Sequence, residues 1–155
     1  SLGLPVVALS AGLAIGGSIG SSLTALVMGY VIMIVIGAGV GTIFKEDEPT
    51  EEMKRRYTAP DKWTFVSALI IGSCFALASL SGGSIGEAVG AGISISLLPP
   101  AVNVGLTMVK DKIPEEKRKE MMKNTALISG VNVLGILISC IIIFSVGCKY
   151  ESFTF

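Results

Sequence analysis

Long uncharged stretches constrain this chain more than any other feature of its sequence. Apolar windows without a charged residue run over 1–44, 63–86, 88–109 and 124–147. A helix needs about 20 apolar residues to cross a hydrocarbon core of roughly 30 Å. The first window is therefore long enough for two crossings and each other window for one. Because only 15% of the residues are charged, we expect an all-α, polytopic transmembrane helical bundle of about five spans.

A soluble protein with buried helices is the alternative interpretation of these windows. The surface helices of a soluble protein carry a polar face, and the four windows show none. A Gly- and Ser-rich segment divides the first window. We expect spans at about 1–16, 19–44, 62–81, 86–109 and 123–147.

The whole sequence, residues 1–155, is interpreted as one transmembrane domain. It begins at Ser1 without a methionine, and its first predicted span is short. We therefore expect a fragment of a longer chain. Cys74 and Cys140 are expected to pack as small apolar residues.

The basic residues are confined to two connections. Segment 45–62 holds five Lys or Arg residues and segment 110–123 holds six, together 11 of the 12 in the chain. Basic loops remain in the cytoplasm, so we expect a multi-pass integral membrane protein with both segments on that side. Solvated loops are the simpler interpretation of these segments, and binding of anionic lipid is the alternative.

Both basic segments contain a pattern typical of a short amphipathic helix. The patterns are EEMKRR in the first segment and PEEKRKEMMK in the second. Pro114 followed by Glu115 and Glu116 favours a helix start, because proline suits the first helical turn and acids complement the helix dipole there.

The first and fourth predicted spans resemble each other. LPVVALSAGL at 4–13 and LPPAVNVGL at 98–106 each precede an Ile/Val-rich helix. Because two spans separate them, they would cross in opposite directions, which indicates an inverted-topology repeat. Proline-interrupted segments in matching halves point to a transport site. Pro5, Pro99 and Pro100 are therefore candidate site residues.

The double proline predicts a break in the fourth span. Proline removes a backbone donor and displaces the carbonyl four residues earlier, which would free the carbonyls near Ile95 and Ser96. An unpaired carbonyl costs several kcal/mol in hydrocarbon. We therefore expect a non-helical patch that is buried between helices near the middle of the membrane.

Polar side chains are expected at a similar depth. By the helical rise, Asn103 lies about 9 Å and Asn132 about 12 Å from the end that carries the basic loops. Ser94 and Ser96 precede the prolines, and Ser129 lies one turn before Asn132. Together they are candidates for a solute or ion pathway. In the alternative, the two asparagines only bond each other or nearby backbone and hold the helices together.

Glu87 is the one acid inside an apolar span. Acids within the membrane are functional candidates, and Glu87 would then line a vestibule that attracts cations. A carboxylate in the first turn of a helix also complements the helix dipole, and both interpretations stay open.

Glycines are expected in two structural roles. The segment GGSIG occurs at 16–20 and at 82–86, where we expect turns, because glycine permits tight reversals. The spacing of Gly37 and Gly41 fits close approach of two helices.

Three motifs resemble those of the domain of unknown function 389 family of membrane proteins. They are SLLPPAVNVG at 96–105, SGVNVLGILI at 129–138 and RRYTAPD at 55–61. Asn132 matches the family pattern, whereas Asn103 stands where members more often have an apolar residue. The resemblance implies a soluble N-terminal cytoplasmic domain upstream of residue 1. It implies no particular activity.

Two functions fit these observations. The first is a small-solute or ion transporter or channel with a site near Pro99-Pro100. The second is a non-transporting scaffold or subunit that anchors a cytoplasmic domain or stabilises a larger complex. The expected partners are the lipid bilayer and either further copies of the chain or other subunits.

Other function classes are not expected. The chain has no His and no Asp in any predicted span, so a serine nucleophile would lack a general base, and we expect no enzyme. No metal-ligand cluster occurs, so we expect neither a metal nor another cofactor. A net charge of zero argues against nucleic-acid binding.

Overall fold

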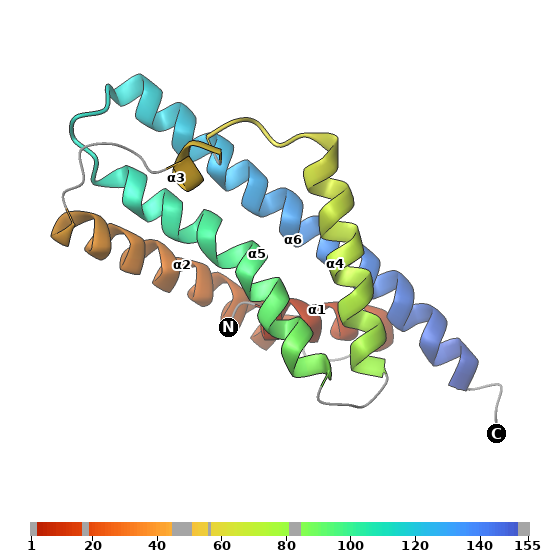
Figure 1. Cartoon of the computed structure of the whole chain (residues 1–155). Coiled ribbons are helices and arrows are strands. Elements are labelled where there is room, and N and C mark those ends of the chain that lie inside the picture. The colour runs from red at the N-terminus through yellow and green to blue at the C-terminus, as the bar shows by residue number, and fades with distance from the viewer. Residues whose placement is uncertain (1–2, 17–18, 45–50, 56, 81–84, 152–155) are drawn as a thin grey trace.

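The computed structural model describes residues 3–16, 19–44, 51–55, 57–80 and 85–151, which form a helical bundle (Figure 1). The all-α prediction is confirmed for these residues. The five predicted spans correspond to α1, α2, α4, α5 and α6, with the largest differences in bounds at the ends of α6. The helices are α1 (Gly3–Ile15), α2 (Ile19–Ile43), α3 (Glu51–Arg55), α4 (Lys62–Leu80), α5 (Ile85–Met108) and α6 (Glu115–Glu151).

Three helices in the described part of the chain are long and apolar enough to cross a membrane. They are α2, α4 and the part of α6 that ends at Gly147. Helix α1 has 13 residues, or about 20 Å of helix, which is short of a hydrocarbon core of roughly 30 Å. Helix α5 has 24 residues, and its described apolar part is Leu97–Met108. By this criterion the bundle has three candidate spans, two fewer than predicted.

The distribution of side chains is the reverse of that in a soluble bundle. Large apolar side chains point outward on three helices, for example Val35 on α2, Ile70 on α4 and Leu134 on α6. An outward apolar surface of this extent is costly in water and favourable in lipid, so the bundle suits a bilayer. Polar side chains are buried between the helices instead: Ser10, Ser22, Asn103, Thr107, Thr125, Ser129 and Ser139.

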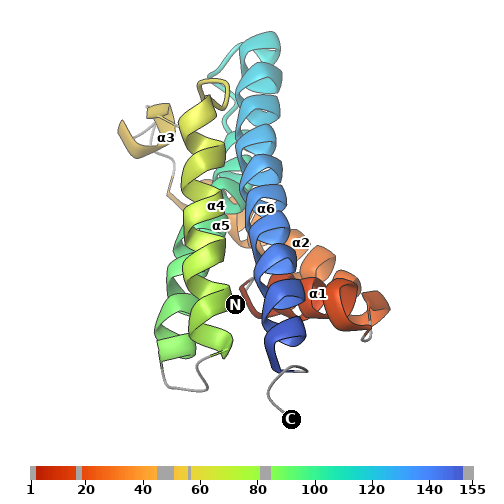
Figure 2. The ribbon, with the colours of Figure 1, turned by 90° about the vertical axis from the view of Figure 1, so that its right-hand side faces the viewer.

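Glycines allow two pairs of helices to approach closely. Helix α4 packs on α6, and α2 packs on α5 (Figure 1, Figure 2). A Cβ added at Gly72 on α4 would overlap Ser139 and the backbone of Ile136 on α6. A Cβ added at Gly37 on α2 would overlap the Val102 carbonyl on α5. The prediction that Gly37 permits close helix approach is therefore confirmed.

The chain leaves α1 at a glycine. Gly16 has a φ of 78°, and its N–H donates to the Gly12 carbonyl over 3.0 Å. A left-handed glycine directly after the last helical residue is a common helix end. The predicted turn role of the first GGSIG segment is thus confirmed at Gly16. The second segment, 82–86, lies largely outside the described residues.

The double proline does not interrupt α5. Pro99 and Pro100 lie inside the helix Ile85–Met108, so the predicted non-helical patch is wrong. Instead, α5 changes direction along its course (Figure 1), and a bend is the usual effect of proline within a helix. Pro100 is fully buried together with Leu97. Packing on neighbouring helices therefore accompanies the helical form of this turn. The predicted burial is correct for Leu97 and Pro100, whereas the side chains of Ile95 and Ser96 lie outside the described residues.

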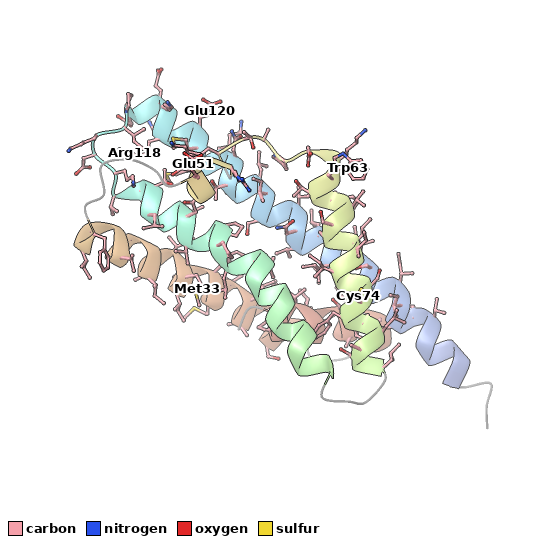
Figure 3. All side chains as sticks on the ribbon, viewed as in Figure 1. Met33, Glu51, Trp63, Cys74, Arg118 and Glu120 are labelled. Atoms are coloured by element: carbon pink, nitrogen blue, oxygen red, sulfur yellow. The ribbon has the colours of Figure 1, made fainter. Side chains whose placement is uncertain are left out.

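The two basic segments meet at one end of the bundle. The Asn124 side chain donates from Nδ2 to the Tyr57 carbonyl over 2.8 Å. The Tyr57 hydroxyl lies 3.4 Å from the Thr107 hydroxyl. Glu51 and Arg118 also lie near this end (Figure 3). The described parts of both segments therefore lie at the same end of the bundle.

The two segments with an amphipathic pattern, 51–56 and 114–123, are helical over most of their described residues. Helix α3 covers most of EEMKRR, and Lys54 pairs with Glu51 at 2.7 Å. Helix α6 begins at Glu115, directly after Pro114, as predicted. It is longer than predicted, because it continues without interruption into the apolar segment. Residues 115–129 contain neither Gly nor Pro to end it.

Candidate functional site

Asn103 has the most unusual environment among the described side chains of the bundle. It lies on α5, one turn after Pro100, and is 3% exposed. Neither its Oδ1 nor its Nδ2 atom has a hydrogen-bond partner. Burying an unpaired amide costs about 2–7 kcal/mol, depending on the reference state, so a native protein rarely leaves one without a reason. The Asn103 amide is therefore the strongest candidate for contact with something other than protein.

Several buried hydroxyls are satisfied by their own helix. Ser10 donates to the Val6 carbonyl over 2.7 Å, and Thr125 donates to the Met121 carbonyl over 2.8 Å. A hydroxyl can bond the carbonyl four residues earlier without leaving the helix. An asparagine amide has two donor hydrogens and an acceptor oxygen, so a single such bond would leave it incomplete. Residue chemistry thus explains why Asn103 differs from the buried serines and threonines.

Polar groups connect Asn103 with the charged end of the bundle. Thr107, one turn further along α5 and fully buried, donates to the backbone carbonyl of Asn103 over 2.7 Å. Its hydroxyl also lies 3.4 Å from that of half-buried Tyr57. Burial raises the pKa of the Tyr57 hydroxyl, and the contact with Thr107 only partly offsets this, so the hydroxyl keeps its proton near neutral pH. We name Asn103, Thr107 and Tyr57 the polar file.

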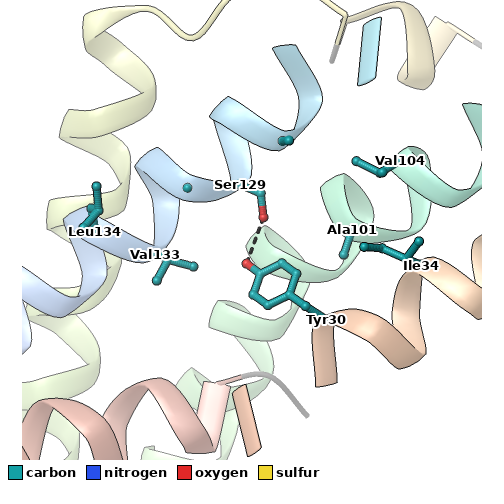
Figure 4. Close-up of a pocket in the computed structure, with 9 residues that line it drawn as sticks. Tyr30, Ile34, Ala101, Val104, Ser129, Val133 and Leu134 are labelled. Carbon is teal, nitrogen blue, oxygen red and sulfur yellow. Dashed lines mark hydrogen bonds between the residues drawn. The ribbon is translucent and has the colours of Figure 1, made fainter. Parts of the chain in front are cut away.

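A groove opens between α2, α5 and α6 (Figure 4). Two polar side chains line this groove: Ser129 on α6 donates to the Tyr30 hydroxyl on α2 over 2.8 Å. The remaining lining is apolar, so the groove suits a hydrocarbon chain or an apolar helix better than a hydrated solute. Its volume is about 390 Å³, and it is lined by Tyr30, Ile34, Ala101, Val104, Ala126, Ser129, Gly130, Val133 and Leu134.

Three of the predicted site residues lie close together in sequence on α5, and two others lie on α6. Pro100 and Asn103 are buried on α5, and Pro99 is half-buried beside them. Ser129 lines the groove, and Asn132 is half-buried further along α6. The two asparagines do not bond each other, because Asn103 makes no hydrogen bond with its side chain.

The remaining predicted site residues belong to α1 and to the first half of α5. Pro5 is half-buried on α1. Glu87, Ser94 and Ser96 belong to α5, but their side chains lie outside the described residues.

Three residues near the site were not predicted. Thr107 could have been found from its position four residues after Asn103, which places both on one helix face. Tyr30 could have been found as a phenol inside an apolar span, since a buried tyrosine hydroxyl usually finds a partner. Tyr57 lies in a polar connection, and nothing in its sequence context indicates that it contacts α5.

The described side chains offer no metal centre. Within the described ranges, no group of three or more His, Cys, Asp or Glu residues is close enough to hold a metal ion. The site around Asn103 consists instead of neutral hydrogen-bonding groups.

Comparison with protein-family models matches residues 1–138 to the family described as Domain of unknown function (DUF389). The matched segment contains α1 to α5, most of α6, the polar file and the groove. The searches of curated proteins and of solved structures gave no significant match. Because the family match covers most of the 155 residues, the chain belongs to the Domain of unknown function (DUF389) family.

Proposed function

We propose that this membrane protein is a transporter or channel for a small solute or ion, with its site around Pro99-Pro100 and Asn103. The observation that carries the proposal is the Asn103 amide, which is buried and unpaired inside the bundle. A polar group that packing alone required would be paired. A group that must bind a passing molecule has to keep its hydrogen-bonding capacity available.

The direction of the polar side chains supports the same proposal. The bundle turns apolar residues outward and encloses neutral polar groups. Polar groups that face the interior of a membrane bundle commonly mark substrate pathways. The Thr107 hydroxyl, which bonds the Asn103 backbone carbonyl, lies next to the hydroxyl of half-buried Tyr57 near the charged end. We propose that a solute exchanges hydrogen bonds along these groups.

The proposed topology has five crossings with the basic segments in the cytoplasm. Its basis is the concentration of Lys and Arg in 45–62 and 110–123. Tyr57 of the first segment is bonded by Asn124, the residue that directly follows the second. Trp63, at the start of α4, is 65% exposed. Tryptophan is enriched where a membrane meets water, which suits an interface at this end.

An inverted repeat forms part of the proposal and has support from the packing. Helix α1 packs on α6, and α5 packs on α2. The first helix of each proposed half therefore contacts the second helix of the other half. A two-fold axis in the membrane plane would produce this exchange, and rocking of one half against the other would then alternate access to the site.

A scaffold or complex subunit is the second candidate, and the groove favours it. Apart from Tyr30 and Ser129, its lining is apolar, so a helix of another copy or subunit could lie there. The interior of a scaffold has no need to admit water. Water access to the polar file therefore separates the two functions.

The experiment is a cysteine-accessibility scan of the full chain in intact membranes. In a background with Cys74, Cys140 and Cys148 replaced by alanine, single cysteines are placed at Asn103 and Thr107. A membrane-impermeant thiol reagent is applied from each side. The proposal expects labelling at both positions, because both would line a hydrated route.

Matched controls are cysteines at Ile70 and Ile138, which point outward on α4 and α6. They are expected to remain unlabelled, because lipid surrounds them. If Asn103 and Thr107 are as unreactive as these controls in folded protein, the transport proposal is rejected and the scaffold stands.

A further inference from the structure

We propose that the Asn103 amide binds a small uncharged molecule that both donates and accepts hydrogen bonds, of the class of water, urea or a small polyol. This inference rests on the proposed transport function and specifies the class of molecule that the site takes. It excludes an ion as the species bound at Asn103.

The first argument is the pair of unsatisfied atoms. Both Oδ1 and Nδ2 of Asn103 lack a partner in the protein. Oδ1 needs a donor and Nδ2 needs an acceptor. A cation would satisfy Oδ1 and repel the Nδ2 hydrogens, whereas an anion would do the opposite. A neutral molecule with a hydroxyl or an amide group can satisfy both atoms together.

The second argument is the absence of a compensating charge among the described side chains. The buried polar residues there are serines, threonines and Asn103, all uncharged. Moving an ion from water into a medium of low dielectric carries a large desolvation penalty, which one amide cannot offset. Glu87 is 16 residues from Asn103 along α5, or about 24 Å at the helical rise.

The third argument is the chemistry of the polar file. The Thr107 hydroxyl directs its hydrogen to the backbone carbonyl of Asn103, so the hydroxyl oxygen remains able to accept a hydrogen bond. The Tyr57 hydroxyl, 3.4 Å away, can donate to that oxygen or to a molecule that comes between them. All members of the polar file are neutral. They suit an uncharged molecule, which can change hydrogen-bond partners without giving up the hydration shell that an ion holds.

The test uses the full chain in proteoliposomes. Stopped-flow light scattering follows vesicle shrinkage in a sucrose gradient, which reports water flow, and re-swelling in a urea gradient. Bilayer recordings in KCl follow ion conductance. We expect the wild type to accelerate water or urea flow over protein-free vesicles without adding ion conductance.

Variants assign the effect to Asn103. Asn103→Leu is expected to return the flow to the protein-free rate, whereas Ser139→Ala, which removes a buried hydroxyl bonded only within α6, should match the wild type. If the leucine variant does not fold, the pair Asn103→Ser and Asn103→Ala replaces it. Serine keeps a donor and an acceptor, so flow should be faster with serine than with alanine.

The outcomes separate this inference from the proposed function. Neutral-solute flow that depends on Asn103 supports both. An ion current that depends on Asn103, or neutral flow that does not depend on it, leaves a transporter but overturns this inference. If neither water, urea nor ions pass faster than through protein-free vesicles, this inference is overturned, and the cysteine scan decides between transport of another solute and the scaffold.

Discussion

The contact between α4 and α6 and the surroundings of Asn103 on α5 show two ways to bury polar atoms in one bundle. In the first, Gly72 lets the helices approach, and Cys140 donates to the Gly72 carbonyl over 3.3 Å. Ser139 is satisfied by carbonyls of its own helix. On α5, the Asn103 side chain is enclosed to a similar degree but makes no bond to the protein.

The two regions differ in hydrogen bonding, although their polar side chains are buried to a similar degree. Both exclude solvent, yet only the α4–α6 contact matches each named side-chain donor to an acceptor. Close packing with full hydrogen bonding is what stability requires. A buried amide without a protein partner serves stability poorly, and this is why we place function at α5 and structure at α4–α6.

The largest expected effect comes from separating α4 and α6. Gly72→Leu should destabilise the protein by more than the about 1–3 kcal/mol that is typical of overpacking, because the added atoms would meet Ser139 and the Ile136 backbone. The measurement is SDS unfolding in mixed micelles, followed by circular dichroism. Gly39→Leu is the control, since a Cβ there meets nothing within 4 Å. Equal effects of the two variants would contradict the close contact.

Asn103→Leu tests the other region and should act in the opposite direction. The amide forms no bond with protein, so its replacement by an apolar side chain of similar shape should leave stability unchanged or raise it by up to about 1–3 kcal/mol. The same unfolding assay measures this. A loss of stability comparable with that of Gly72→Leu would mean that the amide supports the fold, and the distinction between the two regions would fail.

The bond between Ser129 and Tyr30 should contribute less. It joins α6 to α2 over 2.8 Å at the groove. A double-mutant cycle with Ser129→Ala and Tyr30→Phe should give a coupling of about 0.6 kcal/mol, the average for such bonds between membrane helices. Additive effects of the two substitutions would show that the groove is held by apolar packing alone.

The smallest effect is expected at the exposed start of α4. Asp61 caps α4 and accepts from the Thr64 N–H and hydroxyl, each over 2.9 Å. These bonds lower the pKa of the Asp61 carboxyl below its ordinary value of 3.8, the backbone N–H contributing most. Because the pKa is lowered in the folded state, the stabilisation is present above the unfolded-state pKa. It is lost as pH falls through the folded-state pKa.

Asp61→Ala should therefore be slightly less stable than the wild type at neutral pH, and the difference should shrink in acid. Asp61→Asn is the matched control, because asparagine also caps helices well and does not titrate. Thermal unfolding at a series of pH values provides the measurement. A difference that persists unchanged well below pH 3.8 would show that the carboxylate form is not the stabilising one.

The local sequence pattern predicted the bounds of most helices well, but it wrongly predicted a break within α5. The apolar windows located α2, α4 and α5 nearly to their ends, and Pro114 marked the start of α6. At Pro99-Pro100 the expected break did not occur. Residues from other helices surround that turn, and the sequence of α5 alone carries no information about how tightly they pack.

The candidate site was predictable only in part for a related reason. Asn103 could be chosen from sequence because a polar amide in an apolar window is conspicuous. Its lack of a partner could not, since the alternative bond to Asn132 was equally reasonable. The contact of Tyr57 with Thr107 joins residues that are 50 positions apart, beyond the reach of any local pattern.

By itself, the sequence determined which segments become helices and which surfaces favour lipid, because helical hydrogen bonds join residues four apart and hydrophobicity is a property of each side chain. The tertiary structure decided which polar atoms find partners. That outcome depends on the rotation and spacing of helices distant in sequence, which here leave the Asn103 amide unpaired and bring Tyr57 against α5.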